Sequence, residues 1–163
     1  MKKFCIILGI ISLILGCTKD DICSGETLTT PLLVIQFRDI NNRLEAKQVS
    51  SLQILLNNTD STEVISSLSD TIVFIPLNTE ANLSEFIFIQ NSASETDSNA
   101  DNILFSYDRQ EIYENRACGF KVNYSNLSLE VAEEIDTENW ILDTDINTPI
   151  IENENEAHIT IYH

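Results

Sequence analysis

The chain has 163 residues, 43% of them hydrophobic, and a formal net charge of −17 at pH 7. A chain of this length can bury one substantial core but is too short for two comfortable domains. Because so acidic a surface repels phosphate groups, we expect no nucleic-acid partner and no membrane contact through a basic patch.

Residues 1–16 have the pattern of a secretory signal peptide. Two lysines precede an almost unbroken apolar run from Phe4 to Leu15, and charged residues follow soon after the run. The run is too short to span a bilayer comfortably, which favours a cleaved leader. An ordinary secreted protein cleaved elsewhere and an uncleaved helical anchor are the alternatives.

The residues at the end of this leader resemble the signal of bacterial lipoproteins. Such signals end in an aliphatic residue, a small or apolar residue, Gly or Ala, and then Cys; the corresponding residues here are Ile14, Leu15, Gly16 and Cys17. Leu15 is bulkier than is usual at its position. The resemblance implies that Cys17 receives a diacylglycerol and a further acyl chain. Two or more buried acyl chains anchor a protein stably without a transmembrane helix, so we expect membrane attachment through Cys17.

Residues 17–31 form a polar, turn-rich segment, which we interpret as a lipidated tether and first turn. Lys19, Asp20 and Asp21 resemble the charged signal, placed just behind a lipidated Cys, that sends the lipoproteins of some bacteria to the cell surface. The alternative is a simple solvated tether. We therefore expect an outer-membrane location, either on the periplasmic face or at the cell surface.

The four cysteines divide between the leader and the mature chain. Cys5 lies in the leader and Cys17 is the expected lipidation site, which leaves Cys23 and Cys118. Two remaining thiols in an oxidising, exported compartment favour one disulfide. It would close a loop of roughly 95 residues and stabilise the fold by about 4 kcal/mol on the chain-entropy model. Two buried free thiols are the alternative.

Residues 32–163 are rich in short strand signals and contain no long amphipathic helix. Runs of β-branched and aromatic residues, bounded by Asn, Asp and Ser, predict strands. Residues 92–102 are expected to be an exposed loop. Residues 108–116 could be a strand or a helical turn, and residues 131–139 a short helix or a long loop. The expected strands cover residues 32–37, 48–56, 70–77, 85–90, 103–107, 120–124, 140–142 and 157–162.

These signals predict an all-β fold, an antiparallel β-sandwich of about seven to eight strands with room for one short helix. Apolar residues on both faces of residues 70–77 and 85–90 favour burial between layers, and Pro76 favours an edge or a strand end. Trp140 is expected in the core. The domain organisation is therefore a signal peptide at 1–16, a lipidated tether at 17–31 and a single β-sandwich domain at 32–163.

Four short motifs stand out: residues 17–23 (Cys-Thr-Lys-Asp-Asp-Ile-Cys), residues 29–33, residues 116–121 (Arg-Ala-Cys-Gly-Phe-Lys) and residues 157–159. Together they resemble a family of small lipoproteins of Gram-negative bacteria, of the Bacteroidota type, whose function is unknown. The resemblance implies a lipoprotein in which Cys23 pairs with Cys118. It implies no activity, and it suggests an outer-membrane protein as a partner.

We expect no catalytic residues, because nucleophilic catalysis needs a base, usually His, beside the nucleophile. The two histidines are His158 and His163, and an extended strand would point them to opposite faces. We expect both at the surface or on an edge strand. The same geometry disfavours a zinc site, the sequence has no Gly-rich phosphate loop, and we expect no cofactor.

Asp143, Asp145 and Asn147 have the spacing of an oxygen-rich calcium loop, with Glu154 at its twelfth position. The sharp turn of an EF-hand needs Gly at the position of Thr148, and helical patterns do not flank the segment. We therefore reject an EF-hand and expect an acidic loop without a metal. A calcium site of another kind is the alternative.

These observations favour a lipid-anchored envelope protein with a non-enzymatic binding or structural role, which supports another outer-membrane or envelope component. The alternative is a surface module that binds carbohydrate or a small ligand. Exposed aromatic rings would give such a module a stacking surface. The candidates for that surface are Tyr107, Tyr113, Tyr124 and Trp140.

Overall fold

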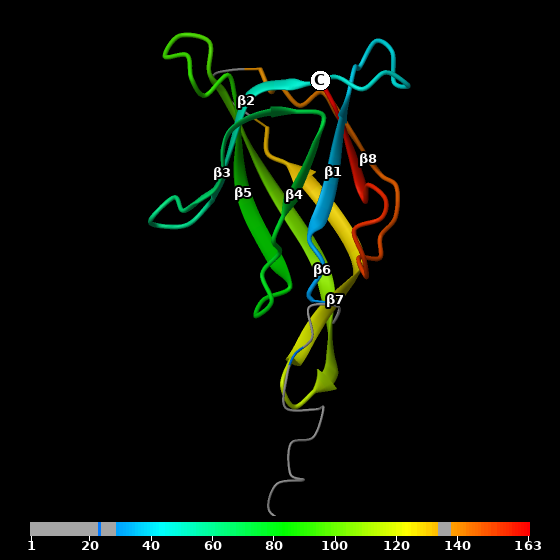
Figure 1. The fold of residues 1–163 in the computed structure, drawn as a ribbon. Helices are drawn as coiled ribbons and strands as arrows, with labels where there is room; N and C mark the ends of the chain where they lie inside the picture. The colour runs from blue at the N-terminus through cyan, green and yellow to red at the C-terminus, as the bar shows by residue number, and fades with distance from the viewer. Residues whose placement is uncertain (1–22, 24–28, 134–137) are drawn as a thin grey trace, which may run out of the picture.

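The computed structural model describes residue 23 and residues 29–133 and 138–163. The expected signal peptide, the lipidation residue Cys17 and the export residues 19–21 lie outside the described residues. Nine strands occur in the described part of the chain (Figure 1). They are β1 (Leu33–Arg38), β2 (Val49–Leu56), β3 (Glu63–Asp70), β4 (Ile72–Ile75), β5 (Leu83–Gln90), β6 (Asn99–Asn115), β7 (Gly119–Val131), β8 (Asp143–Ile146) and β9 (Ile159–Tyr162).

These strands form two sheets, a four-stranded sheet with the order β4-β1-β9-β8 and a five-stranded sheet with the order β3-β2-β5-β6-β7 (Figure 1). Neighbouring strands are antiparallel except β1 and β9, which pair in parallel. Within residues 23, 29–133 and 138–163 there is no helix, and hence none long and apolar enough to cross a membrane. The predicted all-β sandwich is confirmed.

The core lies between the sheets and follows the alternation of apolar residues along the strands. In β1, Leu33 and Ile35 are fully buried, because every second side chain of a strand points to the same face. From the five-stranded sheet, the rings of Phe86 and Phe105 meet edge to face with their centroids 5.9 Å apart. Trp140 is buried, as predicted, and its indole N–H donates to a backbone carbonyl of β5 at 3.0 Å.

Two strands had no clear signal in the sequence. β3 is an edge strand whose side chains are mostly exposed, and β8, which we expected to be an acidic loop, is an edge strand bonded to β9. Such strands can be polar on both faces because a neighbouring strand, rather than burial of their own side chains, holds them in the sheet. The loop expected at 92–102 is shorter than predicted, since β6 begins at Asn99, and residues 140–142 are not a strand.

The prediction that both faces of residues 70–77 are buried is wrong. β4 is an edge strand in which alternate residues face the core, while Ile72 and Phe74 are exposed on the outer face. The strand ends directly before Pro76, which agrees with the expected effect of the proline. In residues 85–90, similarly, the inward side chains are buried and the outward isoleucines only half-buried.

β6 and β7 form a long hairpin that extends beyond the rest of the sandwich (Figure 1). β6 has 17 residues, whereas β1 has 6 and the other strands of the four-stranded sheet have 4 each. At about 3.3 Å per residue, the hairpin is far longer than that sheet and projects past it. Residues 108–115 are therefore strand rather than helical turn.

The turn at the end of this hairpin follows from two residue types. The side chain of Asn115 accepts the backbone N–H groups of Ala117 and Cys118 at 2.9 and 2.8 Å. Gly119 has a φ of 74°, in the left-handed region that glycine adopts without strain. We call residues 113–120 the hairpin tip.

Candidate functional site

The two flanks of the sandwich are closed to different degrees. At the flank formed by the edge strands β7 and β8, the segment after β8 lies against β7. Tyr124 and Ile151 exchange two backbone hydrogen bonds of 3.0 and 2.8 Å, and the N–H of Leu127 donates to the carbonyl of Pro149 at 3.1 Å. Ile151 is fully buried. We call this side of the sandwich the sealed flank.

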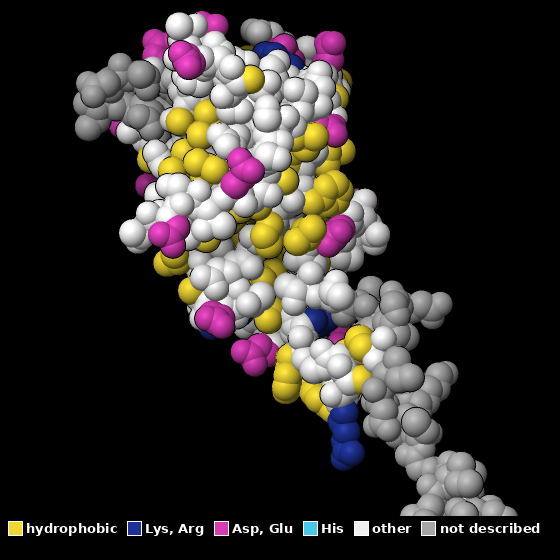
Figure 2. Space-filling model, turned by 60° about the vertical axis from the view of Figure 1, so that its left-hand side comes forward, with side chains coloured by type: hydrophobic (Ala, Val, Ile, Leu, Met, Phe, Trp, Pro, Cys, Tyr) yellow, Lys and Arg dark blue, Asp and Glu magenta, His cyan; other side chains and the backbone are white. Residues whose placement is uncertain are grey.

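The opposite flank, formed by the edge strands β3 and β4, is open. A single residue, Thr71, joins the end of β3 to the start of β4, so the two strands meet there. β3 belongs to the five-stranded sheet and β4 to the four-stranded sheet. An apolar cleft of about 470 Å³ lies between the start of β3 and the end of β4. Figure 2 turns this flank toward the viewer and shows hydrophobic side chains gathered across the middle of the molecule. The apolar residues that line the cleft are Leu56, Val64, Pro76, Leu77, Leu83 and Phe86.

Hydrogen bonds within the protein occupy the polar groups beside the cleft. The hydroxyls of Ser84 and Tyr107 bond at 2.7 Å, and Ser84 also accepts the N–H of Asn78 at 2.8 Å. The Tyr107 hydroxyl donates to the Asn78 carbonyl at 3.1 Å. Burial raises the pKa of Tyr107, which keeps this hydroxyl protonated. Because these groups satisfy one another, the cleft offers a ligand mainly its apolar side chains.

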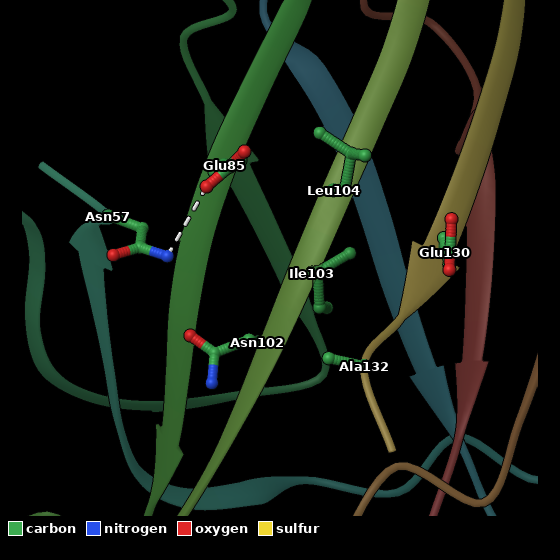
Figure 3. A pocket seen from close by; sticks show the side chains of 7 residues that line it. All are labelled: Asn57, Glu85, Asn102, Ile103, Leu104, Glu130 and Ala132. Atoms are coloured by element: carbon green, nitrogen blue, oxygen red, sulfur yellow. Dashed lines mark hydrogen bonds between the residues drawn. The ribbon is translucent and has the colours of Figure 1, made fainter. Parts of the chain in front are cut away.

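A second depression, of about 280 Å³, adjoins the cleft on the five-stranded sheet (Figure 3). It shares Asn57 and Glu85 with the cleft, and the Asn57 side chain donates to Glu85 at 3.4 Å. Glu85, Leu104 and Glu130 lie side by side in register on three neighbouring strands. Two strand spacings separate the backbones of the two glutamates by about 10 Å. The depression therefore adds negative charge beside the cleft rather than a close pair of carboxylates.

Both histidines are buried, so the expectation of surface or edge positions is wrong. β9 is an inner strand of the four-stranded sheet, with neighbours on both sides. His158 Nδ1 accepts the N–H of Val34 at 3.0 Å. The ring of His163 contacts those of Phe37 and Trp140, with centroid distances of 6.2 and 5.7 Å. Burial lowers the pKa of both histidines, and each serves the packing of the fold.

The residues with the calcium-like spacing lie on and just after β8, where they make contacts within the protein. Arg43 forms a salt bridge with Asp143 and lies 4.4 Å from the centre of the Tyr162 ring. The Tyr162 hydroxyl donates to Asp145 at 2.9 Å, and the Asn147 side chain donates to a backbone carbonyl at 3.0 Å. The hydrogen bond from Arg43 holds the pKa of Asp143 below its usual value. Among the described residues, no three His, Cys, Asp or Glu side chains are grouped to hold a metal ion.

Three of the four aromatic residues considered for a stacking surface lie in the core. Tyr107, Tyr124 and Trp140 are buried, and burial raises the pKa of Tyr124 to about 12. Tyr113 is exposed at the hairpin tip, where its ring meets that of Phe120 at 5.2 Å. The sequence pattern places Phe120 in a strand and predicts no functional role for it. The pairing of β6 with β7 places the two rings opposite each other across the turn. Recognition of this hairpin in the sequence is the signal that could have identified the pair.

Cys23 and Cys118 form a disulfide with a Cα–Cα distance of 4.9 Å, so the expected pairing is present in the structure. The bond joins positions 95 residues apart and ties Cys23 to the turn of the hairpin tip. The described chain resumes at residue 29 beside the hairpin, where Thr30 Oγ1 accepts the N–H of Val122 at 3.0 Å. The hairpin tip and the start of the folded domain are therefore at the same end of the molecule.

Comparisons with known proteins give a family but no function. No similar protein was found among the curated proteins, and no similar structure among those that have been solved. A family model described as a family of unknown function (DUF6452) matches residues 47–163. The match covers well over half of the chain, from just before β2 through β9, and includes the cleft and the hairpin tip. The chain belongs to this family of unknown function, DUF6452.

Proposed function

We propose that this chain is a lipid-anchored envelope protein without enzymatic activity, and that its open flank binds an extended apolar segment of an outer-membrane protein. The observation that carries the proposal is the unequal closure of the two flanks. One flank is sealed by the hydrogen bonds of residues 149–151 to β7, whereas the other keeps an apolar cleft. The open flank thus offers a partner access to the apolar space between the sheets.

The size and lining of the cleft suit an apolar segment. Its volume of about 470 Å³ lies within the range of ligand pockets, about 300–1,000 Å³. β4 borders it as an edge strand, and the backbone groups on the free edge of such a strand can pair with an added strand. Ile72 and Phe74 are exposed on β4. An extended peptide could therefore gain both backbone hydrogen bonds and apolar contacts.

Acidic residues near the cleft define the charge of the partner segment. Glu85 lines both the cleft and the adjoining depression, Glu130 lines the depression, and Glu63 is exposed at the start of β3. In a chain of net charge −17, these carboxylates would attract a segment with basic residues beside its apolar centre and repel an acidic one. We therefore assign the partner segment an apolar core with basic flanks.

The lipid anchor would hold this site close to a partner in the same membrane. Six peptide steps separate Cys17 from Cys23, and they span at most about 20 Å when fully extended. Cys23 is in turn tied to the hairpin tip through Cys118. The non-enzymatic role is supported by His158 and His163, which are both buried in packing contacts rather than exposed beside a nucleophile.

Site-specific photocrosslinking in intact cells tests the proposal. A photoreactive residue replaces either Leu83, which lines the cleft, or Ile150, an exposed residue within the segment that closes the sealed flank. The native side chains are 48% and 51% exposed, so position 150 is a matched control. We expect a defined adduct from position 83, mapped to an apolar segment with basic flanks in one outer-membrane protein, and several-fold less adduct from position 150.

A second variant tests whether the adduct from position 83 depends on the apolar lining of the cleft. Val64→Glu places a charge in the apolar lining, where burial of an unpaired carboxylate is costly, and should abolish the adduct from position 83. Circular dichroism verifies that the variant folds. Equal adducts from positions 83 and 150, no adduct from either, or an adduct from position 83 that survives V64E would contradict the proposal.

A further inference from the structure

We propose that the hairpin tip inserts into the interface of the phospholipid bilayer, with Tyr113 and Phe120 among the lipid head groups and Arg116 on a lipid phosphate. This inference rests on the lipid anchor proposed above. It adds a second, non-covalent membrane contact, which would fix the orientation of the domain on the bilayer.

The two rings form an exposed apolar pair. Tyr113 and Phe120 lie directly opposite each other on β6 and β7, with ring centroids 5.2 Å apart, and are 55% and 65% exposed. They share a face of the hairpin with Val122 and Tyr124, which are buried. The rings thus continue the core-facing side of the hairpin into a region where the opposite sheet no longer covers it. Its hydroxyl gives the Tyr113 ring the polar end that favours the membrane–water interface, and the Phe120 ring adds apolar area beside it.

The sandwich closes before it reaches the hairpin tip. Arg109 on β6 donates to the side chain of Asn82 at 2.8 Å and to the carbonyl of Thr79 at 2.5 Å. These bonds hold the segment between β4 and β5 against β6. Figure 1 shows the hairpin continuing past this segment, away from the other strands. The tip therefore projects from the end of the molecule and can reach a flat surface.

The charge at the tip is suited to phosphate, although the whole chain is acidic. Lys121 forms a salt bridge of 2.9 Å with Glu114, which neutralises that carboxylate. Arg116 is exposed in the turn and forms no salt bridge with any acid among the described residues. Glu111 lies farther from the turn, toward the sandwich. The outermost charged group of the tip is thus a guanidinium, which binds phosphate oxygens well.

The anchor brings this end of the domain to the membrane. Cys118, in the turn of the tip, is bonded to Cys23. The six peptide steps from Cys23 back to Cys17 reach at most about 20 Å. The tip is therefore the part of the described domain that the disulfide ties directly to Cys23, six peptide steps from the proposed lipidation site.

The area of the tip favours lipid over a protein as its occupant. An aromatic side chain buries about 150–250 Å², so two rings bury at most about 500 Å². A stable protein–protein interface takes about 800 Å² from each partner. A pair of rings beside a single Arg is too small for such an interface, but it suffices to orient a domain that acyl chains already hold at the bilayer.

Tryptophan fluorescence in vesicles tests the inference. The full-length protein, produced with its anchor, carries Phe120→Trp and is reconstituted into vesicles of phosphatidylethanolamine and phosphatidylglycerol with brominated acyl chains. The control is Leu44→Trp, at an 87% exposed position between β1 and β2, at the opposite end of the molecule (Figure 1). Trp140 is buried and gives the same background in both variants. We expect the F120W emission to shift to the blue and to be quenched several-fold more than that of L44W.

Tyr113→Trp is a second probe and should behave like F120W. The intact mass of the same samples reports the acyl chains, so failure of the anchor and failure of the inference are distinguishable. Acylated protein in which positions 113 and 120 are quenched no more than position 44 overturns the inference and leaves the anchor in place. Quenching specific to positions 113 and 120 in a chain without acyl groups supports the tip contact and contradicts the anchor. Crosslinking of an unquenched tip to a protein would also overturn the inference.

Discussion

Burial gives the two histidines a measurable effect on stability. His158 accepts a hydrogen bond from Val34, and His163 packs on Phe37 and Trp140. Burial lowers the pKa of both rings from 6.5, because a charged imidazolium is disfavoured in the core. As the pH falls below 6.5, the unfolded chain therefore binds more protons than the folded chain. The stability due to the neutral rings is fully present above pH 6.5 and is lost as the pH falls through their folded pKa values.

We accordingly expect the free energy of unfolding to fall between pH 6.5 and about pH 5, a range above the ordinary pKa of Asp and Glu. Urea unfolding at a series of pH values, followed by circular dichroism, measures the effect. His163→Phe keeps an aromatic ring against Phe37 and removes one titrating group, so it should weaken the pH dependence. A stability that rises toward pH 5, or a dependence that H163F leaves unchanged, would contradict the assignment.

The role of a single residue could be predicted where its type is rare in the chain and the expected oxidising compartment decides its chemistry. Cys23 and Cys118 are the thiols that remain once a leader and a lipidated cysteine are assigned, and they are paired in the structure. The burial of His158 could not be predicted, because it depends on β9 lying between β1 and β8. The exposure of Phe120 could not be predicted either, since an aromatic residue in a strand is more often buried.

At the scale of elements, strands with alternating or continuous apolar residues could be predicted from the sequence. β1, β2 and β5 lie close to their expected ranges. β3 and β8 could not be predicted, because hydrogen bonds to one neighbouring strand hold them in place and few of their side chains are buried. The parallel pairing of β1 with β9 joins distant parts of the chain and has no local signal. The cleft depends on the divergence of β3 from β4 and was therefore not predicted either.

The unequal flanks predict unequal hydrogen exchange. The amides of Tyr124 and Ile151 bond to each other's carbonyls in the sealed flank and should exchange only through large-scale unfolding. β3 is exposed, and its register with β2 is interrupted, with positive φ at Ser51 and Ser67. Its amides should exchange through local opening, orders of magnitude faster. Mass spectrometry of peptides from residues 63–70 and 120–127 compares the two flanks, and equal protection of both would contradict the description.

At the scale of the whole molecule, the disulfide and the hairpin tip lie at one end, and the proposed lipid anchor would join the domain there through Cys23. With the tip in the interface, the long β6–β7 hairpin would stand on the membrane and the open flank would face sideways along it. A binding cleft in this position would meet segments of proteins embedded in the same bilayer. In this arrangement the tip would set the orientation of the domain and the cleft would bind the partner.

The disulfide should stabilise the whole domain. It joins residues 95 apart, and on the chain-entropy model a loop of that length contributes about 4 kcal/mol by restricting the unfolded chain. Replacing both Cys23 and Cys118 by Ser should lower the free energy of unfolding by up to that amount, as measured by urea unfolding. Wild-type protein treated with a reductant is the control and should match the double variant. A change below about 1 kcal/mol would mean that the crosslink positions the tether without stabilising the fold.

The intact mass of the protein extracted from its own cell envelope tests the anchoring of this domain most directly. We predict a chain that begins at Cys17, linked through Cys23 and Cys118, with the added mass of a diacylglycerol and a further acyl chain on Cys17. A chain that retains residues 1–16, or one cleaved elsewhere without acyl groups, would contradict it.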